Sequence, residues 1–550
     1  MAQIKHRANL SGKSFPLLAD NQAQTVIIPQ SDSNYSRYGT PTERIRDVGT
    51  PEAMYMHNVV PTVEGYSAVG IERYQDNSAF QALGKIILKA TPAIDTGISK
   101  YILETKDGAF YQMDGALSID ASGALPGNTL GFTTTGLNVA TYATINGSTY
   151  VYMYDGNIPV GKFGIYSGGT ITNIVPAGLN LTNTKGICAS NGYIIAWTNT
   201  AIAWSAETTP TDFVPSTITG AGGGAIQEAN GFIQFCVPTN FGFIIYCQNN
   251  CVSATYTGNS RFPFNFREIK GAGGGLNLRL VAEGSTFNYQ YAFTTKGLQQ
   301  LYSNYAETVH AEVIDWIKSH AVQYFDTVTL SFTKNDISLG GSANVPRNIG
   351  RLKYIANRYL IYSYLPTTQG TTPTYTYALL YDLELERWGL LKANHIEALE
   401  FNLPQSGSGS DGEVILGGDV PIVFLASNGA ITACSFDRSA DAVLILGKYQ
   451  YVRNRRLCLD EVTVDLMYTN PSAYYGLASP APISGNLYAI PILDGQVYGT
   501  AVQGTLVSSN LTTKSKRYNF LLDAESFLLV ITGSFALNTV AITAHLGGKF

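Results

Sequence analysis

Short apolar runs separated by two to four polar residues recur through most of the chain. Residues 101–105 and 109–113 are two such runs, and Lys106-Asp107-Gly108 lies between them. An Asp-Gly turn between two apolar runs is typical of a β-hairpin, because the turn needs residues that tolerate positive φ. Further hairpins are predicted over residues 191–204, 241–256, 289–302, 374–392 and 422–434. The pattern therefore predicts a mainly β chain with few helices.

The hairpins return at a nearly constant interval. Leu103, Met153, Trp197, Tyr246 and Phe293 occupy matching places in five successive hairpins, at steps of 50, 44, 49 and 47 residues. A period of 40 to 50 residues with several strands in each repeat is typical of a β-propeller, in which one repeat forms one blade. We predict a β-propeller of six to eight blades, with loop insertions, over residues 58–450.

The period fails at three places. Residues 1–57 are polar and loop-like, and we predict an N-terminal arm and docking segment there. Residues 308–319 place Val309, Val313, Trp316 and Ile317 at helical spacing, which predicts one helix packed between blades. Residues 451–550 contain longer alternating strands, and we predict an additional C-terminal β-sandwich-like domain.

The sequence Gly-Ala-Gly-Gly-Gly occurs twice, 51 residues apart. A glycine-rich phosphate loop would be followed by Lys and Ser or Thr, and neither copy is. Because the segment is repeated, we interpret its glycines as structural blade turns rather than as a ligand site. These glycines are Gly220, Gly222, Gly223, Gly224, Gly271, Gly273, Gly274 and Gly275.

The amino-acid composition indicates which kinds of partner the protein can bind. Charged residues are only 14% of the chain, and Tyr and Phe number 35 and 24. Interfaces are enriched in aromatic residues and depleted in Lys and Glu, so this composition suits a subunit of a larger assembly. The net charge of −5 argues against a sequence-independent grip on DNA, which requires a basic surface.

The start of the chain has no signal-peptide pattern, and no apolar run is long enough to span a membrane. We therefore expect synthesis in a cytoplasm. The six cysteines are scattered, and none belongs to a zinc-binding set, so we expect them to be reduced and buried.

No catalytic, cofactor-binding or metal-binding motif stands out, and we expect no enzymatic activity and no cofactor. The chain has no Gly-x-Ser-x-Gly nucleophile turn, no His-Glu-x-x-His and no phosphate-binding loop. Two basic clusters remain. We interpret them as solvated faces or inter-subunit ion pairs, with contact to DNA phosphate as the alternative. Their residues are Arg453, Arg455, Arg456, Lys514, Lys516 and Arg517.

Several segments, in this order, resemble the tail nozzle proteins of short-tailed bacteriophages, the tail tubular protein B or tail hub type. The segments are 58–66, 204–213 with the glycines that follow, 381–388, 514–519 and 524–533. The resemblance implies a β-propeller subunit that forms a homo-oligomeric ring, a hexamer, at the distal end of the virion tail. That ring would be assembled in the host bacterial cytoplasm. It would continue and gate the channel from the adaptor or portal-proximal ring, anchor tail fibres, and let double-stranded DNA pass without sequence-specific binding.

Two other functions stay open at this point. The first is a carbohydrate- or receptor-binding β-propeller module, which would use aromatic surface pockets. The second is a propeller glycosidase or lyase, which would need two facing carboxylates. The sequence offers no such pair, because Asp382, Glu384 and Glu386 alternate as on a solvated strand face.

Overall fold

The computed structural model describes twenty stretches of the 550-residue chain. They are residues 3–9, 25–28, 53–62, 65–95, 98–122, 139–154, 160–167, 169–282, 288–309, 321–326, 331–336, 350–364, 374–400, 422–436, 441–451, 457–466, 486–493, 496–497, 501–510 and 515–546. Strands dominate these residues, and their helices are the short α1 (Ser78–Gln81) and the 3-10 turn η3 (Leu278–Leu280). The prediction of a mainly β chain with few helices is confirmed.

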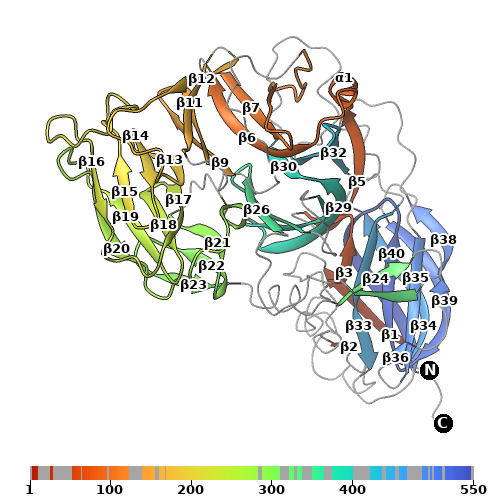
Figure 1. Cartoon of the computed structure of the whole chain (residues 1–550). Coiled ribbons are helices and arrows are strands. Elements are labelled where there is room, and N and C mark those ends of the chain that lie inside the picture. The colour runs from red at the N-terminus through yellow and green to blue at the C-terminus, as the bar shows by residue number, and fades with distance from the viewer. Residues whose placement is uncertain are drawn as a thin grey trace.

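Groups of antiparallel strands follow one another along the chain, and we number them as units 1 to 7 (Figure 1). Units 1 and 2 belong to one sheet, joined by the pair Ser148 and Asp95, and unit 6 is continuous with strands from both ends of the chain. Unit 1 contains β6 (Ile87–Asp95), β7 (Ile98–Thr105) and β8 (Phe110–Met113). Unit 2 contains β9 (Val139–Ile145), β10 (Ser148–Tyr154), β11 (Lys162–Ser167) and β12 (Thr170–Ile174). Each strand pairs with the next one in sequence, which is the up-and-down order of a propeller blade.

Units 3 and 4 are complete four-stranded sheets. Unit 3 contains β13 (Gly186–Ser190), β14 (Tyr193–Trp197), β15 (Ala201–Trp204) and β16 (Gly222–Ala225). Unit 4 contains β17 (Ile233–Thr239), β18 (Gly242–Cys247), β19 (Cys251–Tyr256) and β20 (Phe264–Glu268). Their second strands, β14 and β18, are buried on both faces, because each sheet packs between two neighbours.

Units 5 to 7 complete the series. Unit 5 contains β21 (Gln290–Thr294), β22 (Gly297–Leu301) and β23 (Ala306–Thr308), with Val281 bridged to the first of them. Unit 6 contains β26 (Gly350–Ile355), β27 (Tyr359–Tyr364), β28 (Tyr375–Asp382) and β29 (Arg387–His395). Unit 7 contains β30 (Glu397–Glu400), β31 (Ile422–Leu425) and β32 (Ile431–Phe436).

The strand that completes unit 7 comes from the other end of the chain. β5 (Tyr66–Gln75) pairs with β32 over Val69 to Gln75. Buried side chains of unit 7, including Ile396 and Leu399, share one cluster with Ile87 and Leu103 of unit 1. The last unit therefore lies against the first, and the seven units close into a ring. The β-propeller of six to eight blades itself stays a prediction.

The five residues that define the predicted period occupy equivalent positions in the structure. Leu103, Met153, Trp197, Tyr246 and Phe293 lie in β7, β10, β14, β18 and β21. If the segment around Val281 is counted as the first strand of unit 5, each of these residues lies in the second strand of its unit. The second strand is flanked on both sides, and all five of these side chains are buried.

The last hundred residues form two facing sheets. One contains β34 (Leu457–Leu466), β38 (Thr505–Asn510), β39 (Ser515–Ala524) and β41 (Ala536–Leu546). The other contains β33 (Val443–Tyr451), β35 (Asn486–Leu493), β36 (Gln496–Val497), β37 (Val502–Gln503) and β40 (Ser526–Thr532). Side chains of both sheets meet in one buried cluster, as in a β-sandwich.

The N-terminal strands add to this sandwich. β1 (Gln3–Asn9) pairs with β41 over seven residues, while β2 (Thr25–Ile28) and β3 (Ala53–His57) both pair with β33. The hairpin of β4 (Val59–Pro61) and β5 then leads into the ring. β33 begins at Val443, before residue 451, where the sequence placed the start of the end domain, yet it pairs with β40.

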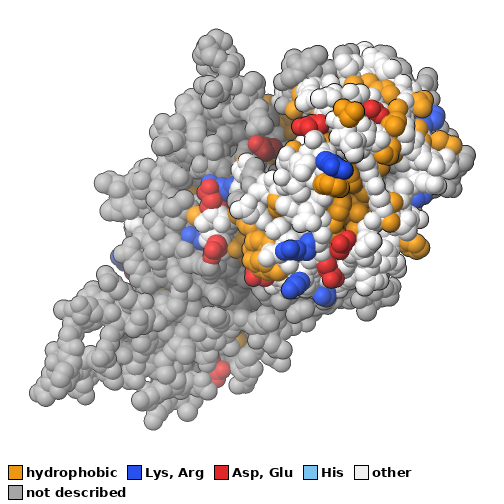
Figure 2. All heavy atoms as spheres, turned by 90° about the vertical axis from the view of Figure 1, so that its left-hand side faces the viewer, with side chains coloured by type: hydrophobic (Ala, Val, Ile, Leu, Met, Phe, Trp, Pro, Cys, Tyr) orange, Lys and Arg blue, Asp and Glu red, His pale blue; other side chains and the backbone are white. Residues whose placement is uncertain are grey.

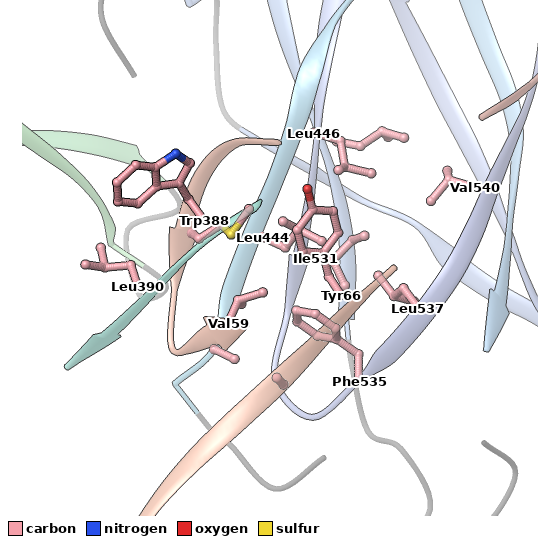
Figure 3. Packing of buried hydrophobic residues seen from close by; sticks show 14 of the residues in the cluster. Val59, Tyr66, Trp388, Leu390, Leu444, Leu446, Ile531, Phe535, Leu537 and Val540 are labelled. Carbon is pink, nitrogen blue, oxygen red and sulfur yellow. The ribbon is translucent and has the colours of Figure 1, made fainter. Parts of the chain in front are cut away.

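Ring and sandwich share one core (Figure 3). Val59, Trp388 and Leu390 approach it from the ring side, and Leu444, Ile531 and Phe535 approach it from the sandwich. Tyr66 lies between the two groups, is 1% exposed, and belongs to the same cluster. The two parts are therefore joined by packed side chains as well as by the chain itself.

Two parts of the chain remain to be placed. β24 (Ala321–Asp326) and β25 (Ser331–Asp336) form a separate two-stranded hairpin. The helix predicted over 308–319 falls almost entirely outside the described residues, since 308 ends β23 and 310–320 are not described.

Candidate functional site

The first glycine segment is mostly an edge strand. Gly220 has φ of +76° and accepts a hydrogen bond from Nε1 of Trp204 at 2.9 Å, so the predicted turn is present there. Gly222, Gly223 and Gly224 instead form β16, paired with β15, and the turn prediction is wrong for them. A Cβ on Gly223 would lie 2.4 Å from the carbonyl oxygen of Ile202. Glycine is needed here for close strand approach.

The second glycine segment links two units. Gly271 has φ of +82°, as a turn requires. The backbone N–H of Gly274 donates to Oγ1 of Thr295 in unit 5 at 2.8 Å, and that of Gly275 donates to the carbonyl of Cys247 in unit 4 at 2.8 Å. The segment, which also includes Gly273, thus runs between the hairpin turns of neighbouring units. The turn prediction holds at Gly271, while the two copies do not share one structure.

Of the six residues in the two basic clusters noted in the sequence, the structure describes Lys516 and Arg517. Arg453, Arg455, Arg456 and Lys514 lie outside the described residues. Arg517, on β39, has Nε at 2.8 Å from Oε2 of Glu461 on β34, so an acidic neighbour already balances its charge. Burial lowers the pKa of the neighbouring Lys516. This half of the second cluster therefore fits an ion pair within the sandwich better than a contact with phosphate.

A polar cluster that the sequence did not indicate lies inside the ring. Glu104 on β7 is 2% exposed, and Lys89 on β6 and Tyr142 on β9 lie close to it. Nζ of Lys89 lies 5.2 Å from the centre of the Tyr142 ring and donates to the carbonyl of Ala140 at 3.4 Å. Burial raises the pKa of Glu104 to about 7, against the opposing influence of Lys89 and Arg279.

The position of Arg279 indicates where in the ring this cluster lies. It belongs to η3, next to unit 5, whereas Glu104 belongs to unit 1, yet the guanidinium acts on that carboxyl. Units 1 and 5 are not neighbours in the ring. A charge influence between units that are not neighbours is expected for groups that face the middle of a ring.

Units 6 and 7 contribute a second buried ion cluster. Nε of Arg351 and Nζ of Lys353, both on β26, each lie 2.6 Å from Oε1 of Glu397 on β30. Glu397 is fully buried and Arg351 is 6% exposed. Two cations on one carboxylate compensate its loss of water, and removal of both would leave the buried carboxylate uncompensated.

A serine and a histidine meet beside this second cluster. Nε2 of His395 lies 2.7 Å from Oγ of Ser363, and Nδ1 lies 2.7 Å from the carbonyl of Ala393. Burial lowers the pKa of His395 to about 4, so the ring is neutral at pH 7. His395 is fully buried and Ser363 is 2% exposed, so a substrate has no access to either. The pair is a packing contact between strands rather than a nucleophile and its base.

The cysteines are packing residues in this structure. Cys188, Cys236, Cys247, Cys251 and Cys434 are buried, and Cys458 is partly exposed. Sγ of Cys251 donates to the carbonyl of Gly273 at 3.2 Å, and burial raises the pKa of Cys247 to about 12. Such thiols stay protonated and unreactive at neutral pH.

Two searches over the described residues were negative. They contain no group of three or more His, Cys, Asp or Glu side chains placed to hold a metal ion. Within the same stretches, no helix is long and apolar enough to cross a membrane.

No family model matches the chain, and no curated protein matches its sequence. Some solved structures are similar in backbone. The computationally designed Ika8 protein is 9% identical over 64% of this chain and 96% of that one, with a TM-score of 0.32. The extracellular domain of the one-component system BT4673 from B. thetaiotaomicron is 10% identical over 77% of this chain and 43% of that one, with a TM-score of 0.31. The dihydro-heme d1 dehydrogenase NirN is 10% identical over 65% and 70%, also with a TM-score of 0.31. Scores this low support no argument, so the functional conclusion depends on this chain alone.

Proposed function

We propose that the chain is a structural subunit of the tail nozzle of a short-tailed bacteriophage. Copies of it would form a homo-oligomeric ring, a hexamer, at the distal end of the virion tail, assembled in the host bacterial cytoplasm. The ring would receive double-stranded DNA from the adaptor or portal-proximal ring, gate its exit and anchor tail fibres. DNA would pass through without sequence-specific binding.

The main support for the proposal is the position in the fold of the segments that resemble tail nozzle proteins. Segment 58–66 forms β4 and the start of β5, segment 381–388 forms the turn between β28 and β29, and segment 524–533 forms β40. These segments are far apart in sequence, yet Val59, Tyr66, Trp388 and Ile531 pack in the one core that joins ring and sandwich (Figure 3). Residues of these three segments thus meet at a single junction, whereas segment 204–213 lies in unit 3, where Phe213 belongs to a different cluster.

The polar interior of the ring supports a mechanical role. Glu104, Glu397 and His395 are all buried, and cations or backbone groups already neighbour them. Groups so placed hold blades together and offer no reactive site. A subunit that must stay folded while DNA is driven past it benefits from such internal ties.

Electron microscopy of the purified chain, alone and with its adaptor ring, tests this proposal. We expect rings of cyclic symmetry with a central channel about as wide as duplex DNA. A chain that stays monomeric at high concentration and also in the presence of the adaptor ring would contradict it.

One surface favours the carbohydrate- or receptor-binding alternative. Tyr302 and Tyr305 stack with ring centres 4.4 Å apart and planes 10° apart, and Tyr305 is 40% exposed. Tyr289 lies beside them, 5.5 Å from the Tyr302 ring centre. Exposed tyrosine rings offer flat apolar faces with polar rims, which suits sugar rings. Binding to a glycan array that is lost in Tyr305→Ala, with Phe262→Ala as the exposed aromatic control, would favour this alternative.

A further inference from the structure

Three buried side-chain oxygens between units 1 and 2 have no hydrogen-bond partner among the described residues. They are Oγ1 of Thr91 on β6, Oε2 of Glu104 on β7 and Oη of Tyr142 on β9. Thr91 and Glu104 both act on the pKa of Tyr142, so the three groups lie close together, although none completes a hydrogen bond. Thr91 is 7% exposed and Glu104 is 2% exposed. Because buried polar groups are nearly always paired, three unpaired oxygens in one place point to a ligand.

Two cations flank these oxygens. Lys89 lies directly opposite Glu104 in the pair of β6 and β7, and Thr91 follows on the same face of β6. Nζ of Lys89 lies 5.2 Å from the centre of the Tyr142 ring. Arg279 on η3 acts on the same carboxyl from the side of unit 5, and it remains partly exposed, so solvent reaches this side of the cluster.

The cluster has an excess of positive charge. Lys89 and Arg279 are the charged groups that act on Glu104. Because burial raises the pKa of Glu104 to about 7, this carboxyl carries about half a negative charge at pH 7, against two positive charges. Such a cluster attracts an anion and repels a metal cation.

Neighbouring charged groups do not reverse this sign. Arg279 also acts on Tyr375 of unit 6, and the ion cluster beside Tyr375 has two cations for one carboxylate: Arg351, Lys353 and Glu397. Glu400 acts on Tyr101, whose side chain lies on the other face of β7 from Glu104. The excess charge around Glu104 therefore remains positive.

The polar atoms of this cluster are mostly hydrogen-bond donors. Lys and Arg side chains only donate, and the hydroxyls of Thr91 and Tyr142 and the protonated carboxyl of Glu104 can each donate one hydrogen bond. A guanidinium suits an oxyanion, because its N–H groups match two oxygens at once. We propose that this cluster binds one small oxyanion between units 1 and 2. The anion would link groups of units 1, 2 and 5, and the inference does not depend on the nozzle function.

Sulfate is a suitable probe, since its charge does not change near neutral pH. Isothermal titration calorimetry of the full chain at pH 6 should show saturable binding of one sulfate per chain. We expect Arg279→Gln to weaken this binding roughly tenfold or more, as loss of a charge-assisted hydrogen bond does. Tyr142→Phe removes only the unpaired hydroxyl, so it should weaken binding by a smaller factor and leave the fold intact.

The matched control is an arginine on the outer surface. Figure 2 shows the face of units 3 and 4, where Lys and Arg side chains are exposed among acidic and apolar ones. Arg261 is exposed in the loop between β19 and β20. Arg261→Gln should bind sulfate as the parent does, because an exposed guanidinium is hydrated and its charge is screened by salt.

Sulfate binding should depend on pH through Glu104. Its carboxyl can donate to the anion only when protonated, and with a pKa of about 7 most of the protonated form is lost between pH 6 and pH 8. We expect the affinity to fall about tenfold over this range, in proportion to the binding-competent form. Glu104→Gln, whose amide still donates, should bind equally at both pH values. Burial holds the pKa of Tyr142 well above its ordinary value, so its hydroxyl does not titrate here.

The absence of saturable sulfate binding by the parent at pH 6 would overturn the proposal. Equal affinities in the parent, Arg279→Gln and Tyr142→Phe would also overturn it, as would a parent affinity that is the same at pH 6 and pH 8. If circular dichroism shows that Arg279→Gln does not fold, the results for Tyr142→Phe and Glu104→Gln decide. None of these outcomes affects the ring assembly that tests the nozzle function.

Discussion

At the scale of single residues, the most informative group is Glu104. Burial raises its pKa to about 7, above the ordinary value of 4.5. The folded state therefore holds a proton that the unfolded state releases between these pH values. Stability from this group is fully present below pH 4.5 and is lost as the pH rises through 7, by about 3 kcal/mol at 1.36 kcal/mol per pKa unit.

We expect Glu104→Gln to remove this part of the pH dependence, since the amide has the same shape and does not ionise. The measurement is the thermal unfolding midpoint at pH 5 and pH 8, for which the parent should lose several degrees more than the variant. Glu307→Gln, at an exposed position, is the control. An unchanged difference between the two pH values would show that Glu104 is not the responsible group.

His395 should act in the opposite direction. Burial lowers its pKa to about 4, below the ordinary value of 6.5. Stability from the neutral ring is present above pH 6.5 and is lost as the pH falls through 4, again by about 3 kcal/mol. We expect His395→Gln to be less stable than the parent at pH 7 and to lose less on acidification to pH 4. Urea unfolding at both pH values measures this, and equal losses would contradict it.

At the scale of elements, the two glycine segments make a matched pair for mutagenesis. A Cβ on Gly274 would lie 2.0 Å from the carbonyl oxygen of Gln248, whereas nothing lies within 4 Å of a Cβ on Gly224. We expect Gly274→Ala to destabilise the fold by roughly 1–3 kcal/mol, as overpacking does, and Gly224→Ala to be nearly neutral. Chemical unfolding of both variants checks this. Similar losses in both would mean that the link between units 4 and 5 can relax.

Elements were predictable where the information is local. The Asp107-Gly108 turn and the apolar second strands could be recognised in the sequence, because a similar pattern of buried positions recurs from unit to unit. The pairing of β1 with β41 could not be predicted in this way, because the two strands are more than 500 residues apart in sequence. Glu104 and Lys89 were missed for a related reason. In sequence, a charged residue in a strand looks solvated, and only closure of the ring buries it.

At the scale of the whole molecule, the shared core determines how the protein unfolds. Phe535 is 1% exposed and packs with Tyr66, and both belong to the cluster that also contains Trp388 of the ring and Ile531 of the sandwich. Because ring and sandwich bury apolar surface against one another, neither presents a complete core when separated. We therefore expect one cooperative unfolding transition for the described parts of the chain.

Phe535→Ala tests this coupling. The substitution should cost about 3–5 kcal/mol, the range for a large aromatic removed from a core. Calorimetry should show the single transition moving to lower temperature as a whole. Leu521→Ala is the control, since Leu521 is 96% exposed and should leave the midpoint unchanged. If Phe535→Ala instead splits the transition in two, with the ring unaffected, the sandwich folds on its own and the shared core is only a contact between independent domains. A single shifted transition would mean that a force applied at the sandwich reaches the ring through packed side chains, as a tail subunit under the pressure of passing DNA requires.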